Sequence, residues 1–121
     1  MVALYVDDDE SNRRLMAKMF ARFRPDHTLV CVSSAGEALE QIRAAPSDLV
    51  LLDLGLPDAR GEDLMTTIKA SYDVPVIIVS GEVREDVRRQ LMAKGAGAYL
   101  LKPFEPAELF AEVDRLLKPL G

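Results

Sequence analysis

The chain has 121 residues, which is enough for one domain with a single hydrophobic core. Its composition, with 49% hydrophobic and 29% charged residues, is ordinary for a soluble globular protein and argues against disorder. The net charge of -5 argues against a nucleic-acid-binding surface. No apolar run is long enough to span a membrane, and the N-terminus lacks a signal-peptide pattern.

Strand-like and helix-like segments alternate along the chain. Val2–Val6 predicts a strand, and the apolar residues that follow at helical spacing predict a helix over about Ser11–Arg24. Thr28–Val32 predicts a second strand. Ser34 and Glu37 then have the spacing of a capping box, in which each side chain caps a backbone amide at the start of a helix.

The alternation continues to the end of the chain. The remaining predicted elements are a strand at Leu49–Leu52, a helix from Gly61, a strand at Val74–Val79, a helix at Glu85–Lys94, a strand at Ala98–Leu101 and a helix from Pro106. Five short strand–helix repeats with apolar strands predict an α/β fold, a parallel sheet with helices on both faces. We expect a single domain over residues 1–121, in which residues 118–121 could begin a linker.

Polar residues follow the predicted strands at the point where each strand ends. In a parallel sheet these ends meet at one edge, which is where open α/β sheets bind ligands. The second strand adds only serines there. The ionisable or hydroxyl side chains that we expect at this edge are Asp7, Asp8 and Asp9 after the first strand, Asp53 after the third, Ser80 after the fourth and Lys102 after the fifth.

This set of side chains indicates phosphoryl chemistry. Carboxylates from the first and third strands would repel each other, and the pKa of at least one would rise unless a cation lies between them. Oxygen ligands without histidine or cysteine suit Mg²⁺, with Mn²⁺ as a second candidate. A lysine and a hydroxyl beside the metal offer a positive charge and a donor to an anion. Together they describe a phosphoryl-transfer site with an aspartate nucleophile.

The single cysteine, Cys31, excludes an intramolecular disulfide and a cysteine-rich metal site. It lies within an apolar strand, so we interpret it as a small buried hydrophobic residue rather than a nucleophile. Cysteine usage of this kind is typical of a reducing compartment, and we expect a cytoplasmic protein.

In this order, the residues resemble the receiver domain of two-component response regulators over about Ala3–Leu117. The motifs that carry the resemblance are Asp7-Asp8, Asp53 four residues before Pro57, Ser80-Gly81, Tyr99 and Lys102-Pro103-Phe104. The resemblance implies a flavodoxin-like, three-layer, doubly wound (βα)5 fold with strand order 2-1-3-4-5. Gly55 and Glu82 lie where this family tunes the lifetime of the phosphate, and the lifetime stays open.

The resemblance implies a metal site as well. Asp8 and Asp53 would bind Mg²⁺ directly together with the backbone carbonyl of Gly55, and Asp7 would act through a metal-bound water. Asp9 has a different reading: as an extra acid it would start the first helix.

Phosphorylation and switching are also implied. Asp53 would accept a phosphoryl group from the phosphohistidine of a sensor histidine kinase or phosphotransfer protein, or from small donors, and would later lose it by autodephosphorylation. Lys102, joined to Pro103 by a cis peptide bond, would neutralise phosphoryl oxygens, and Ser80 would bind one in the product. Tyr99 would then swing inward and change the face formed by the fourth helix, fifth strand and fifth helix.

That face carries opposite charges, which would allow a weak, phosphorylation-dependent homodimer. The basic residues are Arg84, Arg88, Arg89 and Lys94 near the fourth helix, and the acidic ones are Glu108, Glu112 and Asp114 in the fifth. An equally good interpretation is that these charged residues lie on solvated helix faces and bind no partner.

Two other classes of protein stay open. Asp7, Asp9 and Ser11 resemble the nucleophile motif of haloacid-dehalogenase-type phosphatases, in which Asp7 would be the nucleophile, but that assignment leaves Asp53 without a role. A flavodoxin-like cofactor binder would have the same strand order. It would need a phosphate-binding loop after the first strand, where this chain has acids.

Overall fold

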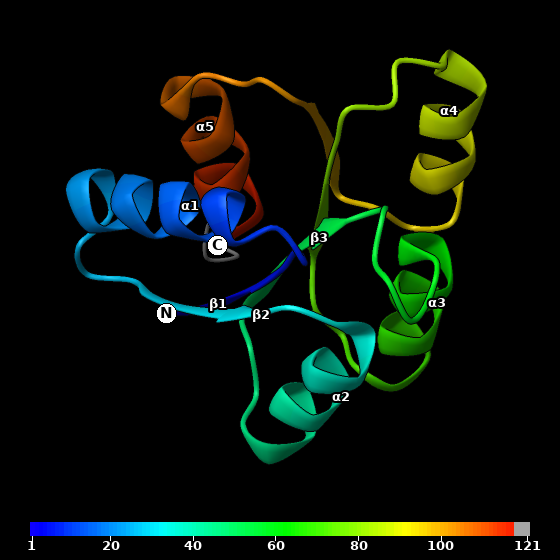
Figure 1. Cartoon of the computed structure of the whole chain (residues 1–121), viewed down its shortest axis with the longest axis horizontal. Helices are drawn as coiled ribbons and strands as arrows, with labels where there is room; N and C mark the ends of the chain where they lie inside the picture. The colour runs from blue at the N-terminus through cyan, green and yellow to red at the C-terminus, as the bar shows by residue number, and fades with distance from the viewer. Residues whose placement is uncertain (118–121) are drawn as a thin grey trace.

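A computed structural model describes residues 1–117 and shows five strands alternating with five helices (Figure 1). The residues predicted to begin a linker, 118–121, lie outside the described part. The elements are β1 (Val2–Val6), α1 (Glu10–Phe23), β2 (Thr28–Val32), α2 (Ala35–Ala44), β3 (Leu49–Asp53), α3 (Gly61–Ser71), β4 (Val76–Ser80), α4 (Glu85–Ala93), β5 (Ala98–Leu101) and α5 (Pro106–Leu117).

The strands form one parallel sheet in the order β2-β1-β3-β4-β5, which confirms the predicted topology. β3 lies at the centre, and its residues Leu49–Leu52 are fully buried. Such a strand reads as a continuous apolar run because helices cover both faces of the sheet.

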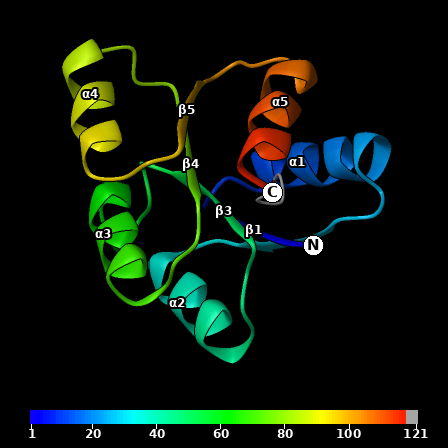
Figure 2. The ribbon, with the colours of Figure 1, turned by 180° about the vertical axis from the view of Figure 1, so that it is seen from behind.

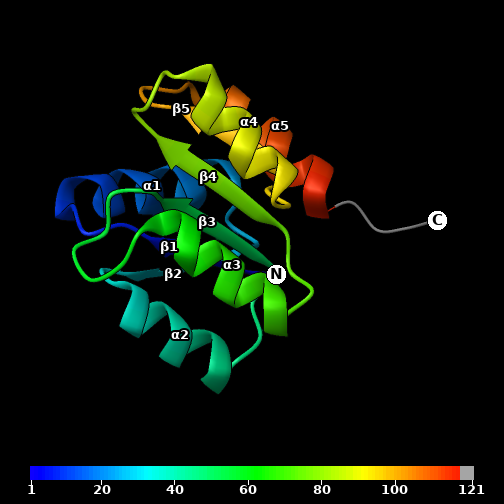
Figure 3. The same cartoon turned by 90° about the vertical axis from the view of Figure 1, so that its right-hand side faces the viewer.

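Helices cover the two faces unequally. α2, α3 and α4 pack against one face through a cluster that includes Ile42, Met65 and Leu91. α1 and α5 pack against the other through a cluster that includes Phe20 and Phe110, whose rings meet edge to face with centroids 5.1 Å apart. Figure 2 shows the two groups of helices from behind, and Figure 3 shows the sheet between them. The molecule is therefore a three-layer sandwich.

Several element boundaries differ from the prediction by one or two residues. β3 includes Asp53, one residue later than expected, and β4 begins at Val76 rather than Val74. Pro75 has no N–H for the ladder, so it contributes only its carbonyl, which accepts a bond from Val50. α1 begins at Glu10, and Asp9 caps it by accepting from the amide of Asn12. The helix-starting role of Asp9 is confirmed.

Local interactions mark the start of α2 and the end of α4. Ser34 accepts from the amide of Glu37, which confirms the serine half of the predicted capping box, whereas Glu37 accepts from the amide of Ser33 rather than that of Ser34. Asp58, from the loop after β3, also accepts from the amides of Ala35 and Gly36 and so fixes that loop to the start of α2. α4 ends at Ala93, and Gly95, two residues later, has a φ of 109°, a conformation that favours glycine.

None of the helices in residues 1–117 is both long and apolar enough to cross a membrane.

Candidate functional site

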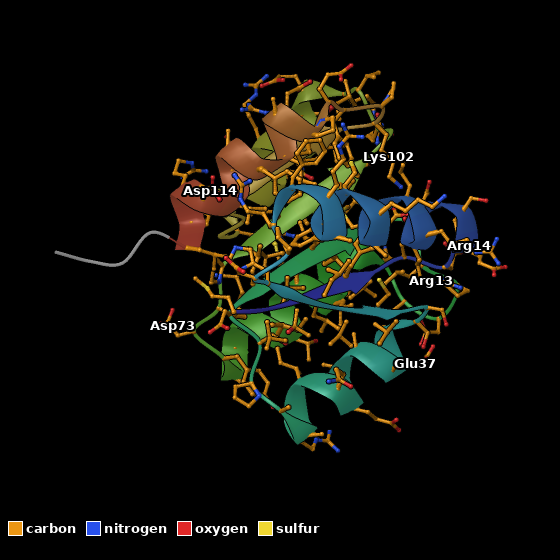
Figure 4. All side chains as sticks on the ribbon, turned by 90° about the vertical axis from the view of Figure 1, so that its left-hand side faces the viewer. Arg13, Arg14, Glu37, Asp73, Lys102 and Asp114 are labelled. Carbon is orange, nitrogen blue, oxygen red and sulfur yellow. The ribbon has the colours of Figure 1, made fainter. Side chains whose placement is uncertain are left out.

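The polar residues predicted at the strand ends do meet at one edge of the sheet. Register places the ends of neighbouring strands level, with Asp53 beside Val79 and Ser80 beside Leu101. Figure 4 shows Lys102 at this end of the molecule and Asp73 and Asp114 at the opposite end. The side chains at this edge come from the residue after β1, the end of β3, the end of β4 and the residue after β5.

Lys102 lies between the two carboxylates. Its Nζ is 3.2 Å from Oδ2 of Asp7 and 3.3 Å from Oδ2 of Asp53. Its amide donates to the carbonyl of Ser80, and the Lys102–Pro103 peptide bond is cis, as predicted. The lysine is three-quarters buried, so its charge acts on both acids with little screening by solvent.

Asp7 is fully buried and richly hydrogen-bonded. Its Oδ2 accepts from the hydroxyl of Tyr5 at 2.5 Å and from Asn12, and its Oδ1 accepts from the amide of Asp9. Burial acts to raise the pKa of Asp7, but the bonds from Tyr5 and Asp9 and the charge of Lys102 outweigh it and hold that pKa below its ordinary value. Asp7 is therefore ionised at neutral pH.

Asp53 behaves in the opposite way. Burial raises its pKa and the charge of Asp7 adds to the rise, while the amide of Gly55, 3.2 Å from Oδ1, and the charge of Lys102 oppose it. The pKa of Asp53 is thus raised as the sequence predicts, but burial is the largest cause and repulsion from Asp7 only adds to it. Asp53 is the half-buried carboxylate of the pair, whereas Asp7 has no exposed surface.

The acids can hold a cation. Asp7, Asp8 and Asp53 each offer a carboxylate oxygen, and these oxygens lie within 4.8 Å of one another. Asp8 is exposed, so a metal can be reached from solvent. All three ligands are hard oxygens, a donor set that fits Mg²⁺.

A cavity of about 510 Å³ opens beside Asp53, and Ser80 and Glu82 help to line it. Ser80 is 5% exposed, and its Oγ accepts from the amide of Glu82 at 3.0 Å. Tyr99 is half-buried, and its hydroxyl donates to the carbonyl of Glu82 at 2.8 Å. Ser80 and Tyr99 are thus joined through the backbone of Glu82.

Sequence reasoning missed two residues of the site, Tyr5 and Asn12. Apolar periodicity places Tyr5 only within the first strand. The alternation of side chains along a strand contains the missing signal, because Tyr5 is two residues before Asp7 and so lies on the same face. Asn12 reaches Asp7 from the first turn of α1, and the precise start of a helix is poorly determined by sequence.

Comparison with known proteins identifies the fold and the family. Residues 3–114 match the family described as the response regulator receiver domain. The chain belongs to this family. It is 32% identical over 110 residues to the transcriptional regulatory protein KdpE of Staphylococcus aureus, covering 91% of this chain and 47% of KdpE. It is 33% identical over 115 residues to the DNA-binding response regulator MtrA of Mycolicibacterium smegmatis, covering 95% of this chain and 50% of MtrA.

Solved structures agree. The BeF3-activated N-terminal receiver domain of RstA from Klebsiella pneumoniae superposes with a TM-score of 0.91 at 26% identity, covering 98% of this chain and 100% of that one. This chain therefore has the fold of a response-regulator receiver domain, and it spans about half the length of KdpE and MtrA.

Proposed function

We propose that this receiver domain accepts a phosphoryl group on Asp53 from the phosphohistidine of a sensor histidine kinase or phosphotransfer protein, with Mg²⁺ bound. The observation that carries the proposal is the position of Lys102, which lies 3.2 and 3.3 Å from carboxylate oxygens of Asp7 and Asp53 beside a cluster of three acids. An acidic cluster that can hold a cation, an ammonium group and an aspartate at one edge of the sheet are the components that phosphoryl transfer needs.

In the reaction, an oxygen of Asp53 forms the new bond to phosphorus as the bond from phosphorus to the histidine nitrogen breaks, and the imidazole leaves with the electron pair. Asp8, Asp53 and the carbonyl of Gly55 would hold Mg²⁺, and Asp7 would act through water; the bound ion would supply positive charge beside the transferring group. Lys102 neutralises a second phosphoryl oxygen, and Ser80 donates its hydroxyl to a third in the product. Water later hydrolyses the acyl phosphate in autodephosphorylation.

The phosphatase alternative is not favoured. It requires Asp7 as the nucleophile, but this carboxylate is fully buried, and its Oδ2 accepts from Tyr5, Asn12 and Lys102. An oxygen that is already hydrogen-bonded by three donors is a poor nucleophile. Asp53 keeps a partly exposed side chain beside the cavity and is the better acceptor.

Phosphorylation would change the surface formed by α4, β5 and α5. Ser80 now accepts from the amide of Glu82, and in the phosphorylated state it would turn toward the phosphoryl group. Tyr99 would leave the carbonyl of Glu82 and swing inward. This change of surface, in a cytoplasmic protein, would be read by a partner or by a second copy of the domain.

The test is incubation with acetyl phosphate and Mg²⁺, followed by intact-mass measurement. We expect the addition of one phosphoryl group, its loss over time, and no addition without Mg²⁺. Asp53→Asn should take up none, and Lys102→Ala should take it up much more slowly. Equal phosphorylation of the wild-type protein and Asp53→Asn would refute the proposal.

A further inference from the structure

A buried phenol lies under the carboxylate of Asp7. Tyr5 is 1% exposed, and its hydroxyl donates to Oδ2 of Asp7 at a distance of 2.5 Å. The ring packs with Met16 and Met19 in the cluster beneath α1, where phenylalanine would fill the same space without a polar group that needs a partner. The hydroxyl is therefore explained by Asp7 and not by packing.

Oδ2 of Asp7 is crowded with donors. Besides Tyr5 at 2.5 Å, it accepts from Nδ2 of Asn12 and Nζ of Lys102, each at 3.2 Å. A carboxylate oxygen has about two lone-pair sites, so the short bond from Tyr5 occupies one, and Asn12 and Lys102 share the other. Lys102 is consequently held loosely by Asp7 and lies just as near to Asp53, at 3.3 Å.

We propose that Tyr5 is a positioning residue that frees Lys102 to move from Asp7 to the phosphoryl group on Asp53. The inference rests on the proposed phosphorylation of Asp53. When Lys102 moves, the buried carboxylate of Asp7 keeps its bonds from Tyr5 and Asn12, so no charged oxygen is left without a partner. Without the hydroxyl, Asp7 binds Lys102 more tightly. Asp7 then competes with the phosphoryl group for Lys102, and Lys102 competes with the cation for Asp7.

The test compares Tyr5→Phe with Tyr72→Phe, a matched change at a half-buried tyrosine that caps the end of α3. Two quantities are measured: the rate of phosphorylation by acetyl phosphate at saturating Mg²⁺, and the Mg²⁺ dissociation constant by calorimetry. Tyr5→Phe should lower the rate about tenfold, as expected for losing one hydrogen bond to a charged group, and raise the dissociation constant several-fold. Tyr72→Phe should change neither.

A double-mutant cycle separates positioning from packing. In a Lys102→Ala background no lysine competes, so Tyr5→Phe should no longer change the Mg²⁺ dissociation constant. An undiminished effect in that background, or wild-type values for Tyr5→Phe alone, would overturn the inference.

Asn12 is half-buried and lies in α1, so Asn12→Ala removes another donor to Oδ2 of Asp7 without disturbing the core. This variant is used in case Tyr5→Phe fails to fold. It should shift both quantities in the same direction by about two- to threefold, since Asn12 makes the longer bond. An unchanged phosphorylation rate and an unchanged Mg²⁺ dissociation constant would contradict the idea that the donors to Oδ2 of Asp7 control Lys102. Absence of phosphorylation in the wild-type protein would refute the proposed function instead, while the Mg²⁺ measurements would still decide the role of Tyr5.

Discussion

At the scale of single residues, the ionised carboxylate of Asp53 is destabilised in the metal-free protein. Its burial raises the pKa of the carboxyl, and the charge of Asp7 adds to the effect. An uncharged side chain of the same shape avoids this cost. We therefore expect Asp53→Asn to raise the melting temperature of the metal-free protein by a few degrees at pH 8, measured by circular dichroism, and to weaken Mg²⁺ binding.

Asp73→Asn is the control, because Asp73 is exposed and lies at the far end of the molecule (Figure 4). Its melting temperature should equal that of the wild-type protein. A lower melting temperature for Asp53→Asn would show that the lost contact with Lys102 outweighs burial.

The gain should depend on pH. The folded pKa of Asp53 lies above its unfolded value, about 3.9, so the folded state binds this proton more tightly than the unfolded chain. The wild-type protein is thus stabilised by this proton at low pH and loses that stabilisation as pH rises through the folded pKa. The advantage of Asp53→Asn should be smallest near pH 4 and grow toward pH 8. A pH-independent difference would contradict this explanation.

At the scale of elements, the start of α3 is packed against the end of β3. A Cβ added at Gly61 would come within 2.6 Å of the Cα of Leu54 and 2.7 Å of the carbonyl oxygen of Asp53, both backbone atoms. We expect Gly61→Ala to lower the free energy of unfolding by about 1–3 kcal/mol, measured by urea denaturation, and to slow phosphorylation by displacing Asp53. Gly81→Ala, where nothing lies within 4 Å of the added Cβ, is the matched control and should retain wild-type stability.

Equal stability of the two glycine variants would show that the loop between β3 and α3 shifts to admit the added methyl group without loss of stability. The same loop is also held by Asp58 at the start of α2, so its freedom to move is limited from two sides.

The sequence predicts elements better than contacts. All five strands and five helices follow from apolar periodicity, and the edge site follows from where parallel strands end. The hydrogen bond from Tyr5 to Asp7 and the shared position of Lys102 depend on side-chain geometry that periodicity does not contain. The pairing of surface charges is unpredictable for the same reason, because long side chains choose among several nearby partners.

At the scale of the whole molecule, a cation that binds only the folded state adds to its stability. Mg²⁺ at a hundredfold excess over its dissociation constant should add about 2.7 kcal/mol to the free energy of unfolding. Asp8→Asn removes an exposed carboxylate that we propose as a ligand, and it should abolish most of this gain. Urea denaturation with and without Mg²⁺ measures the effect, and Asp73→Asn again is the control. Full stabilisation of Asp8→Asn by Mg²⁺ would contradict the proposed ligand set.

The predicted dimer face is altered by the pairs seen within the chain. Asp114 pairs with Arg24, which follows α1, so it does not belong to a patch facing α4. Lys94 pairs with Glu62 of α3. Arg89 in α4 and Glu108 in α5 are exposed and would be available to a second copy.

Because exposed ion pairs contribute little, a dimer through α4, β5 and α5 should be weak. Light scattering should show a rise in mass with beryllium fluoride that disappears at high salt. A mass that stays monomeric at high protein concentration would leave the switch to act on another partner.

The central claim is that Asp53, and not Asp7, carries the phosphoryl group. The direct measurement is reduction of the phosphorylated protein with borohydride, which converts an acyl phosphate of aspartate to homoserine, followed by peptide mass spectrometry. We predict homoserine at position 53 alone. Homoserine at position 7 would contradict the account and favour the phosphatase reading.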